Sequence, residues 1–220
     1  MFLRLVNLLN ANTRLIHRTI LIAALHTPLA SVAQTTNAEV FLQTPAFLKD
    51  RIAEYEVQSK NMPPHLRHAI FASETGPWHG PGLFSNDLLK SASYFLLSEF
   101  SVPKQKHQNT LRFKLMTELN AFASEDALLF IIAEHGYFGR TAIGIEAAAQ
   151  AYFAKSTKEL QLSEIAYLAG VLKAPTRYGA EPHATQRRDY VLDLMEWNGH
   201  LTPEQKATAQ SDVLQLRDFP

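Results

Sequence analysis

Apolar residues recur at the spacing of an α-helix along most of the chain. In one segment they fall every three or four positions, at Leu111, Leu115, Leu119 and Phe122, which is typical of an amphipathic helix. The run ALLFIIA at 127–133 is apolar on every side and predicts a buried helix. No alternating pattern of useful length predicts a strand, so the expected fold class is all-α. Further helices are expected at 47–59, 63–74, 145–155, 162–172 and 185–199.

Proline, glycine and short polar side chains mark the expected helix ends. Pro63 and Pro64 suit the first turn of a helix that Gly76 ends just after Glu74. Three glycines and two prolines predict a loop over residues 76–85. The other expected boundaries are a cap at Ser163, an end at Pro175, a left-handed residue at Gly199, a capping box at Thr202 to Gln205, and a tight turn between Gly139 and Gly144.

Composition places the chain among globular proteins of one domain. It has 220 residues, of which 46% are apolar and 19% charged, with a formal net charge of zero. Without the first 33 residues, which carry three arginines and no acid, the balance becomes weakly acidic. That balance gives no reason to expect nucleic acid as a partner. The chain has no cysteine, which excludes disulfides, thiol nucleophiles and cysteine zinc sites.

The first 33 residues have the pattern of a secretory signal peptide. Arg14 and Arg18 precede the apolar run Thr19–Leu25, and Ser31 and Ala33 provide the small residues of a cleavage site. A retained membrane anchor is the alternative, although the apolar run is short for a span. The sequence therefore predicts a signal peptide at 1–33, an N-terminal lead-in at 34–62 and one folded domain at 63–220.

The C-terminal half carries the most specific pattern. Gly136–Tyr178 reads GYFGRTAIGIEAAAQAYFAKSTKELQLSEIAYLAGVLKAPTRY, and Arg187–Met195 reads RRDYVLDLM. These blocks resemble the peptidoglycan glycosyltransferases (glycosyltransferase family 51), whose members typically read YFGxGxxGIEAAAxxYFxKxxxxLxLxExAxLAGxxxxPxxY and RRxxVLxxM. The family comprises the monofunctional transglycosylases and the transglycosylase domains of penicillin-binding proteins. The resemblance implies a lysozyme-like transglycosylase fold in a single all-α domain.

Most residues of these blocks are scaffold positions. Three consecutive alanines allow close helix packing, and we expect Ala147, Leu168 and Val191 to be buried. The leucines and isoleucine of the next segment are expected to supply core: Leu160, Leu162, Ile165, Leu168 and Leu172. The strongest part of the resemblance therefore concerns fold more than catalysis.

The segment MPPHLRHAIFASETGPWHG resembles the family's first motif, in which a helix leads into E-D-x-x-F-x-x-H-x-G. Glu74 falls on the catalytic glutamate, Thr75 replaces the aspartate, and Trp78 falls on the aromatic residue. Glycosyl transfer from a lipid diphosphate needs a base for the acceptor hydroxyl and cations for the departing diphosphate. Glu74 suits the base, because a helix C-terminus and partial burial disfavour its charge. The alternative is a surface glutamate that ends a helix.

The second motif, G-G-S-T-x-T-Q-Q-x-x-K, is matched by GPGLFSNDLLK at 80–90. Ser85 and Lys90 agree with it, whereas Leu83, Asn86 and Asp87 replace its threonine and glutamines. The family's long segment between the first two motifs is essentially absent. That segment forms much of the membrane-facing part, so the resemblance implies a domain with a reduced membrane-facing part and only peripheral membrane contact.

The third motif, R-K-x-x-E, supplies cations for the diphosphate and a second glutamate. Lys114 and Glu118 have its spacing, with Arg112 nearby, and lie on one helical face. Counting back from the YFG block instead puts Arg112 at the glutamate position. An ordinary surface pair is an equal alternative for Lys114 and Glu118. His135 is expected to be structural, and nothing has metal-site spacing.

Three readings follow from these residues. The first is a glycan polymerase that joins lipid II units, with Glu74 and Glu118 as carboxylates and Ser85, Lys90, Arg112 and Lys114 at the substrate. The second is a non-catalytic descendant that binds peptidoglycan or a cell-wall synthase. The third and weakest is a lytic transglycosylase. A divalent cation such as magnesium is the one cofactor the resemblance implies. The expected location is the periplasm or the outer face of the inner membrane.

Overall fold

The computed structural model describes residues 45–77, 85–99, 108–180 and 182–218. The predicted signal peptide lies outside these residues. The described segments are helical, and their only β-type feature is an isolated bridge between Tyr137 and Ile143, so the all-α prediction is confirmed. None of their helices is both long and apolar enough to cross a membrane. The elements are α3 Pro45–Ser59, α4 Pro64–Thr75, α5 Ser85–Glu99, α6 Gln108–Phe122, α7 Glu125–His135, α8 Ile145–Phe153, η2 Thr157–Glu159, α9 Leu162–Val171, α10 Pro175–Tyr178, α11 His183–Trp197 and α12 Pro203–Ser211.

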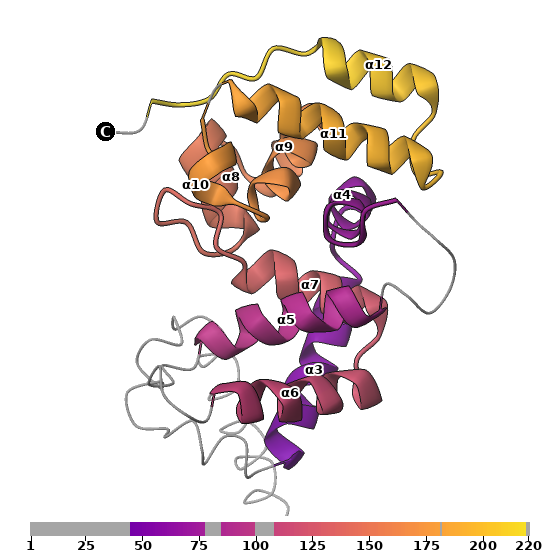
Figure 1. Cartoon of the computed structure of the whole chain (residues 1–220), viewed down its shortest axis with the longest axis vertical. Coiled ribbons are helices and arrows are strands. Elements are labelled where there is room, and N and C mark those ends of the chain that lie inside the picture. The colour runs from indigo at the N-terminus through magenta and orange to yellow at the C-terminus, as the bar shows by residue number, and fades with distance from the viewer. Residues whose placement is uncertain (1–44, 78–84, 100–107, 181, 219–220) are drawn as a thin grey trace, which may run out of the picture. The chain divides into compact units, whose positions relative to one another are not determined.

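The helices of residues 38–220 form two groups that share one helix (Figure 1). In the first group α7 packs between α3 and α5, and α6 lies against both of those helices. In the second group α9 and α11 pack along each other, with α12 on α11. The helix α4 contacts α5 and α7 of the first group and α9 and α11 of the second. The C-terminal end of α4 is therefore a place where side chains from both groups can meet.

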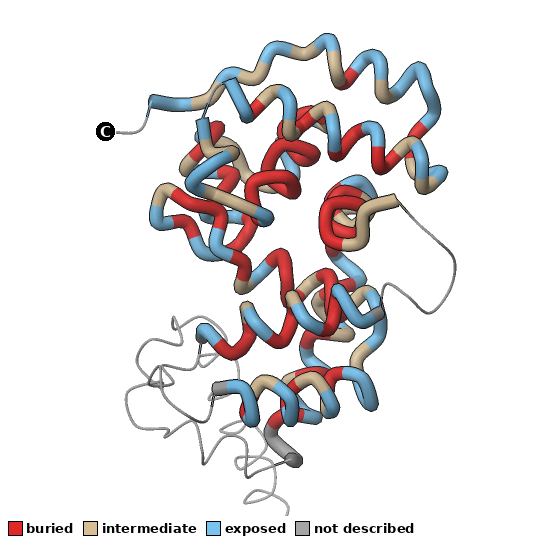
Figure 2. Tube along the Cα trace, in the orientation of Figure 1, coloured by how far each residue is buried: buried red, intermediate tan, exposed pale blue. Residues whose placement is uncertain are grey.

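The core runs through both groups and through α4 (Figure 2). Ala69, Ile70 and Ala72 of α4 have no exposed surface, and neither do Leu168 of α9 and Val191 of α11. The N-terminal helix α3, expected at 47–59, contributes Leu48, Ile52 and Tyr55 to the same core. Residues of the segment 34–62, the predicted N-terminal lead-in, thus share a hydrophobic core with residues of the predicted domain at 63–220.

The tight turn between α7 and α8 forms as predicted. Gly139 and Gly144 have φ values of +80° and +85°, which residues other than glycine rarely adopt. The turn closes through hydrogen bonds from the Phe138 amide to the Ala142 carbonyl and from the Ala142 amide to the Gly139 carbonyl. A Cβ on Gly144 would lie 2.7 Å from the carbonyl oxygen of Glu134, so this glycine also permits a close approach of two backbone segments.

Helix capping confirms two predictions and corrects one. Thr202 and Gln205 form the expected capping box of α12, and Gly199 has a φ of +76° just beyond α11. The cap of α9 is Gln161, which forms a capping box with Glu164. Ser163 was the expected cap, but it lies inside the helix and is buried. The carboxylate of Glu164 sets the start of α9, because it accepts a hydrogen bond from the backbone amide of Gln161 at 2.9 Å.

Two other expectations about packing need correction. Ala147 was expected to be buried with its neighbours, but it is exposed while Ala148 and Ala149 have no exposed surface. Only part of a helix surface can face the core, and a run of three residues turns through most of a circle. Leu160 and Leu162 are only partly buried, at the edge of the core. The helix α5 was not expected, because its first residues were assigned to a polar cleft motif.

Candidate functional site

Glu74 lies at the end of α4, and its side chain is only 3% exposed. The helix continues for one residue to Thr75, whose hydroxyl donates to the Phe71 carbonyl at 2.8 Å. Gly76 then leaves the helix with a φ of +72°. This end of α4 lies where the two helical groups meet, so the carboxylate is enclosed by segments distant in sequence.

Two donors bind the same oxygen of Glu74. The Ser91 hydroxyl of α5 donates to Oε2 at 2.5 Å, and the Lys173 ammonium donates to Oε2 at 2.8 Å. Lys173 also donates to the backbone carbonyl of Glu74 at 3.3 Å. One oxygen of the carboxylate is therefore held by both an ion pair and a short hydrogen bond.

Arg187 of α11 lies behind this pair. Its guanidinium donates to the Ser73 hydroxyl at 3.1 Å and to the Gly170 carbonyl at 3.2 Å. It also lies against two aromatic rings, 5.2 Å from the Tyr178 centroid and 4.9 Å from the Tyr190 centroid. Burial lowers its pKa, while the two tyrosines and Glu74 act in the opposite direction. Arg187 therefore connects α11 to α4 one residue before Glu74.

The next residue, Arg188, has a different environment. It is 2% exposed and donates to the backbone carbonyls of Asp212 and Gln210, at 2.5 and 2.9 Å. It also forms an ion pair with Asp189 at 2.8 Å. The two arginines of the RRxxVLxxM-like block thus hold different parts of the chain. Arg187 reaches the site, and Arg188 holds the segment after α12.

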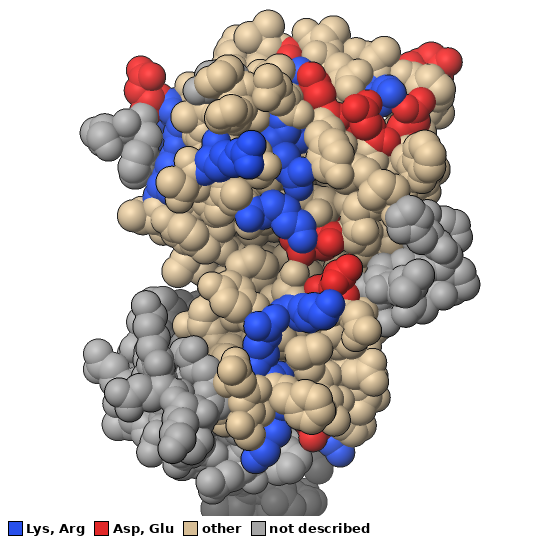
Figure 3. Space-filling view, viewed as in Figure 1, with Lys and Arg blue, Asp and Glu red and all other residues tan. Residues whose placement is uncertain are grey.

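Further cations lie on α5 and α6, on the other side of Ser91. Lys90 is paired with Asp87 at 3.1 Å, and both side chains are about half exposed. Arg112 donates to the Lys90 carbonyl at 3.5 Å, and its guanidinium carbon lies 5.9 Å from the Tyr94 centroid. Basic side chains gather on this face above and below a small group of carboxylates (Figure 3). Lys90 and Arg112, both expected at the substrate, are therefore brought together.

The remaining sequence-predicted residues are not brought to Glu74. Lys114 and Glu118 lie on α6, which packs against α3 and α5 but not against α4, and Lys114 is exposed. Among the described residues, neither has a hydrogen bond or ion pair with a site residue. Ser85 begins α5, but its side chain lies outside the described atoms. Trp78 and Leu83 lie outside the described residues as well.

His135 has a structural environment. Its Nε2 lies 3.0 Å from the hydroxyl of Tyr55, which is buried in the core. Burial and then the charge of Arg51 lower its pKa to about 4, so the imidazole is neutral at pH 7. The tautomer of the neutral ring determines whether Nε2 or the hydroxyl donates this hydrogen bond.

The described residues contain no group of three or more histidine, aspartate or glutamate side chains placed to hold a metal. Oε2 of Glu74 is already bonded to an ammonium and a hydroxyl.

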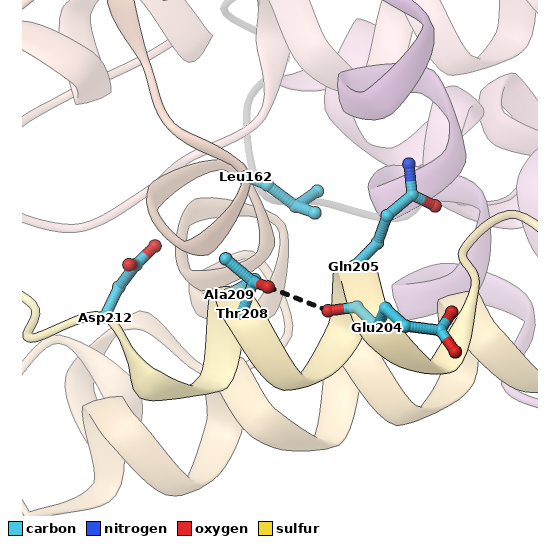
Figure 4. Close-up of a pocket in the computed structure, with 6 residues that line it drawn as sticks. All are labelled: Leu162, Glu204, Gln205, Thr208, Ala209 and Asp212. Atoms are coloured by element: carbon cyan, nitrogen blue, oxygen red, sulfur yellow. Dashed lines mark hydrogen bonds between the residues drawn. The ribbon is translucent and has the colours of Figure 1, made fainter.

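Other cavities in the described part of the chain lie away from Glu74. One of about 320 Å³ lies between α12 and the start of α9 and is lined by Leu162, Glu204, Gln205, Thr208, Ala209 and Asp212. A side-chain hydrogen bond between lining residues runs from the Thr208 hydroxyl to the Glu204 carbonyl, within one turn of α12 (Figure 4). No basic residue lines it, so it does not resemble a diphosphate site.

Comparison with known proteins finds relatives for part of the chain. A family model described as Transglycosylase matches residues 96–196, a little under half of the chain. Penicillin-binding protein 1A of Pseudomonas aeruginosa is 36% identical over 106 residues, which cover 47% of this chain and 12% of that protein. The protein of the same name from Aquifex aeolicus is 45% identical over 84 residues, covering 37% and 12%. That from Neisseria flavescens is 32% identical over 130 residues, covering 58% and 16%.

Among solved structures, penicillin-binding protein 1A from Haemophilus influenzae covers 60% of this chain and 17% of its own. Its TM-score is 0.38 at 24% identity, a likeness too low to support a structural argument. The chain spans between 12% and 16% of the length of the three relatives above.

The matched segment is similar to the transglycosylase class, the class that its motif blocks also resemble. Residues 96–196 are thus similar to the transglycosylase family, and the chain as a whole is similar to part of the penicillin-binding proteins 1A. The matched range contains Arg112, Lys173 and Arg187 but begins after Glu74 and Ser91. The role of Glu74 therefore rests on its own geometry.

Sequence reasoning missed Ser91, Lys173 and Arg187 as site residues. Lys173 and Arg187 lie inside the blocks that resemble the family. The sequence shows these residues but not which way their side chains point. Ser91 follows Lys90 directly, and no pattern distinguished it from the other serines of α5.

Proposed function

We propose that this chain is an exported peptidoglycan glycosyltransferase-type protein that joins lipid II units with low turnover, and that Glu74 is its general base. The observation that carries the proposal is the arrangement of that carboxylate. It is nearly inaccessible, it ends a helix between two helical groups, and one oxygen is held by Ser91 and Lys173. A carboxylate fixed in this way is oriented for proton transfer before substrate arrives.

The chemistry assigns different tasks to the two oxygens of Glu74. The hydroxyl of an acceptor sugar attacks the anomeric carbon of the donor, the bond from that carbon to the lipid diphosphate breaks, and the hydroxyl proton passes to Oε1. Among the described residues Oε1 has no hydrogen-bond partner, whereas Oε2 has two. Lys173 and Ser91 therefore fix the carboxylate without occupying the oxygen that would receive the proton.

Charge on the departing diphosphate requires cations near Glu74. Lys173 is paired with Glu74 itself, and Arg187 lies next to Ser73. Lys90 precedes Ser91 in α5, and Arg112 donates to the Lys90 carbonyl. Electrostatic stabilisation of developing charge is usually the largest catalytic contribution, so these four side chains are the proposed diphosphate contacts. Lys114 and Glu118 remain predictions that no contact with this set supports.

A second candidate is a non-catalytic protein that binds peptidoglycan or a cell-wall synthase. One observation favours it: Asp87, where the family has a neutral amide, pairs with Lys90 at 3.1 Å. That carboxylate partly neutralises a proposed diphosphate contact and would repel the diphosphate. Losing one stabilising donor typically lowers a rate about 10²–10³-fold. This is why the proposal specifies low turnover.

The experiment compares polymer formation from labelled lipid II by wild type, Glu74→Gln and a matched control. Glu164→Gln is that control, since Glu164 is also buried and paired with a lysine, its Oε1 lying 2.7 Å from Lys155 Nζ. We expect slow polymerisation by wild type and none by Glu74→Gln. The control Glu164→Gln should still form polymer. Circular dichroism would verify that each variant is folded.

Each outcome distinguishes the candidates. Equal polymer from wild type and Glu74→Gln would remove Glu74 from the mechanism. If neither wild type nor any variant forms polymer, and wild type binds isolated peptidoglycan, the non-catalytic binding function would be supported and the enzymatic one rejected. Glu118→Gln, run in parallel, should retain the wild-type rate if α6 contributes no second carboxylate to the reaction.

A further inference from the structure

A second cavity, independent of Glu74 and of the proposed reaction, has a mixed lining. It measures about 430 Å³ and lies between α4, the start of α7 and the turn from α11 to α12. This volume falls within the range of small-molecule sites, about 300–1,000 Å³. Its lining comprises Arg67, His68, Phe71, Glu125, Asp126, Leu129, Asn198 and His200.

Two stacked histidines form one wall of this cavity. The rings of His68 and His200 are parallel to within 6°, with centroids 4.1 Å apart, and Phe71 meets His200 edge-on at 5.9 Å. Burial and then the proximity of His200, His65 and Arg67 lower the pKa of His68, while Asp126 opposes this; burial lowers that of His200. Both rings are thus neutral at pH 7. Nδ1 of His68 is shielded from solvent and has no hydrogen-bond partner among the described residues.

The charges on the opposite wall do not balance. Arg67 lies 3.2 Å from Asp126 and also donates to the Ser59 carbonyl, so its charge is already matched. Glu125 has no cation within ion-pair distance among the described residues. Glu125 is exposed and lies in the first turn of α7. Partial burial and then the charge of Asp126 raise its pKa. A cation in the cavity would favour its ionised form.

The lining therefore combines one carboxylate with no ion-pair partner among the described residues, two neutral imidazoles and the apolar side chains Phe71 and Leu129. Neutral imidazoles provide lone pairs and aromatic faces, both of which attract an ammonium group. The apolar side chains can contact the methylenes next to such a group. The described residues contain no cluster with metal-binding placement, so a metal cation fits less well.

We propose that the cavity between α4, α7 and the α11–α12 turn binds a primary ammonium on a short alkyl chain, with Glu125 as its counter-ion and the His68–His200 stack as its wall. The amine could be carried by a peptide, as in a lysine-like side chain, or belong to a free diamine. The shared chemistry is the alkylammonium.

The test uses the full chain with labelled histidines at pH 7.5, followed by NMR. Pentylamine is the probe, and 1-pentanol and pentanoate have similar length with neutral and negative charge. We expect pentylamine to shift the His68 and His200 signals saturably at millimolar concentration, and pentanol and pentanoate to shift them at least about tenfold more weakly, as loss of a charged hydrogen bond implies. Nα-acetyl-lysine methylamide and 1,5-diaminopentane then distinguish a peptide-borne amine from a free one.

Glu125→Gln should weaken pentylamine binding at least about tenfold. The matched control is Glu204→Gln, because both glutamates lie in the first turn of a helix with a side-chain cap, at Ser124 and Thr202. It should leave the affinity unchanged. His200→Gln, which removes one ring of the stack, should also weaken binding. Equal binding of pentylamine and pentanol, or unchanged affinity in folded Glu125→Gln, would overturn the proposal.

Discussion

Acid should destabilise this protein through one histidine, His135. Its Nε2 lies 3.0 Å from the Tyr55 hydroxyl, and its ring meets the Tyr55 ring edge-on with centroids 5.7 Å apart. Protonation would place a positive charge in a buried site near Arg51. Burial and the charge of Arg51 consequently lower the pKa of His135 from 6.5 to about 4.

The sign and size of the effect follow from proton linkage. Above pH 6.5 the imidazole is neutral in both folded and unfolded chains, so its contribution to stability is fully present. Between pH 6.5 and 4 the unfolded chain binds a proton that the folded chain does not, and the free energy of unfolding falls. Each unit of pKa difference corresponds to about 1.4 kcal/mol. The total loss is therefore about 3 kcal/mol, a large part of a typical stability of about 5–15 kcal/mol.

The assay is urea denaturation of wild type and His135→Gln at several values between pH 7.5 and 4. Many carboxylates titrate in this range, so the informative quantity is the difference in unfolding free energy between the two proteins. Glutamine does not titrate, and the other groups cancel. We expect wild type to lose about 3 kcal/mol relative to the variant by pH 4. NMR of the folded protein should show His135 still neutral at pH 5.5.

A difference between the two proteins that does not change with pH would refute this reasoning. So would a His135 signal that titrates near pH 6.5 in the folded protein. Tyr55→Phe adds a second check, since it keeps the ring and removes only the hydroxyl. Because burial and Arg51 lower the pKa of His135, that pKa should stay well below 6.5 in the variant.

Three further predictions concern the scaffold and the N-terminus. Leu168→Ala should destabilise the fold by about 2–5 kcal/mol in thermal or urea unfolding, because Leu168 has no exposed surface; a loss well under 1 kcal/mol would place it at the surface. Gly144→Ala should cost more than Gly199→Ala in the same assay. Both glycines have positive φ, but only at Gly144 would a Cβ meet backbone, 2.7 Å from the Glu134 oxygen. Export with cleavage near Ala33 would be detected by N-terminal sequencing of periplasmic material, and an intact Met1 on a membrane-bound form would contradict it.

The fold class and most helices could be predicted because apolar spacing and end signals are local properties. Thr202 and Gln205 form their box within four residues, and Gly139 and Gly144 form their turn within six. The exception is α5. Its apolar residues Leu88, Ala92 and Leu96 recur every fourth position and are fully buried, so the helical signal was present in the sequence. The helix was nevertheless not predicted, because residues 80–90 were matched to a polar motif.

The site was predictable only in part for a different reason. Glu74 could be identified from the flanking pattern and from its place at a helix end. Its partners Ser91 and Lys173 lie 17 and 99 residues away in sequence. Spacing along one helix shows which residues share a face, but not which helices meet. Lys114 and Glu118 illustrate this limit, since they share a helix whose neighbours are α3 and α5 rather than α4.

The adjacent arginines of α11 have a mechanical consequence. Arg187 ties the helix to Ser73, beside the carboxylate, and Arg188 ties it to the carbonyls of residues 210 and 212. Because α11 is a single helix of 15 residues, any rotation about its axis moves both attachments at once. Tension on the C-terminal segment would therefore be transmitted through α11 to the end of α4. Amide hydrogen exchange at residues 73–76 should accelerate when Arg188 is replaced by glutamine, and unchanged exchange there would show that the two attachments move independently.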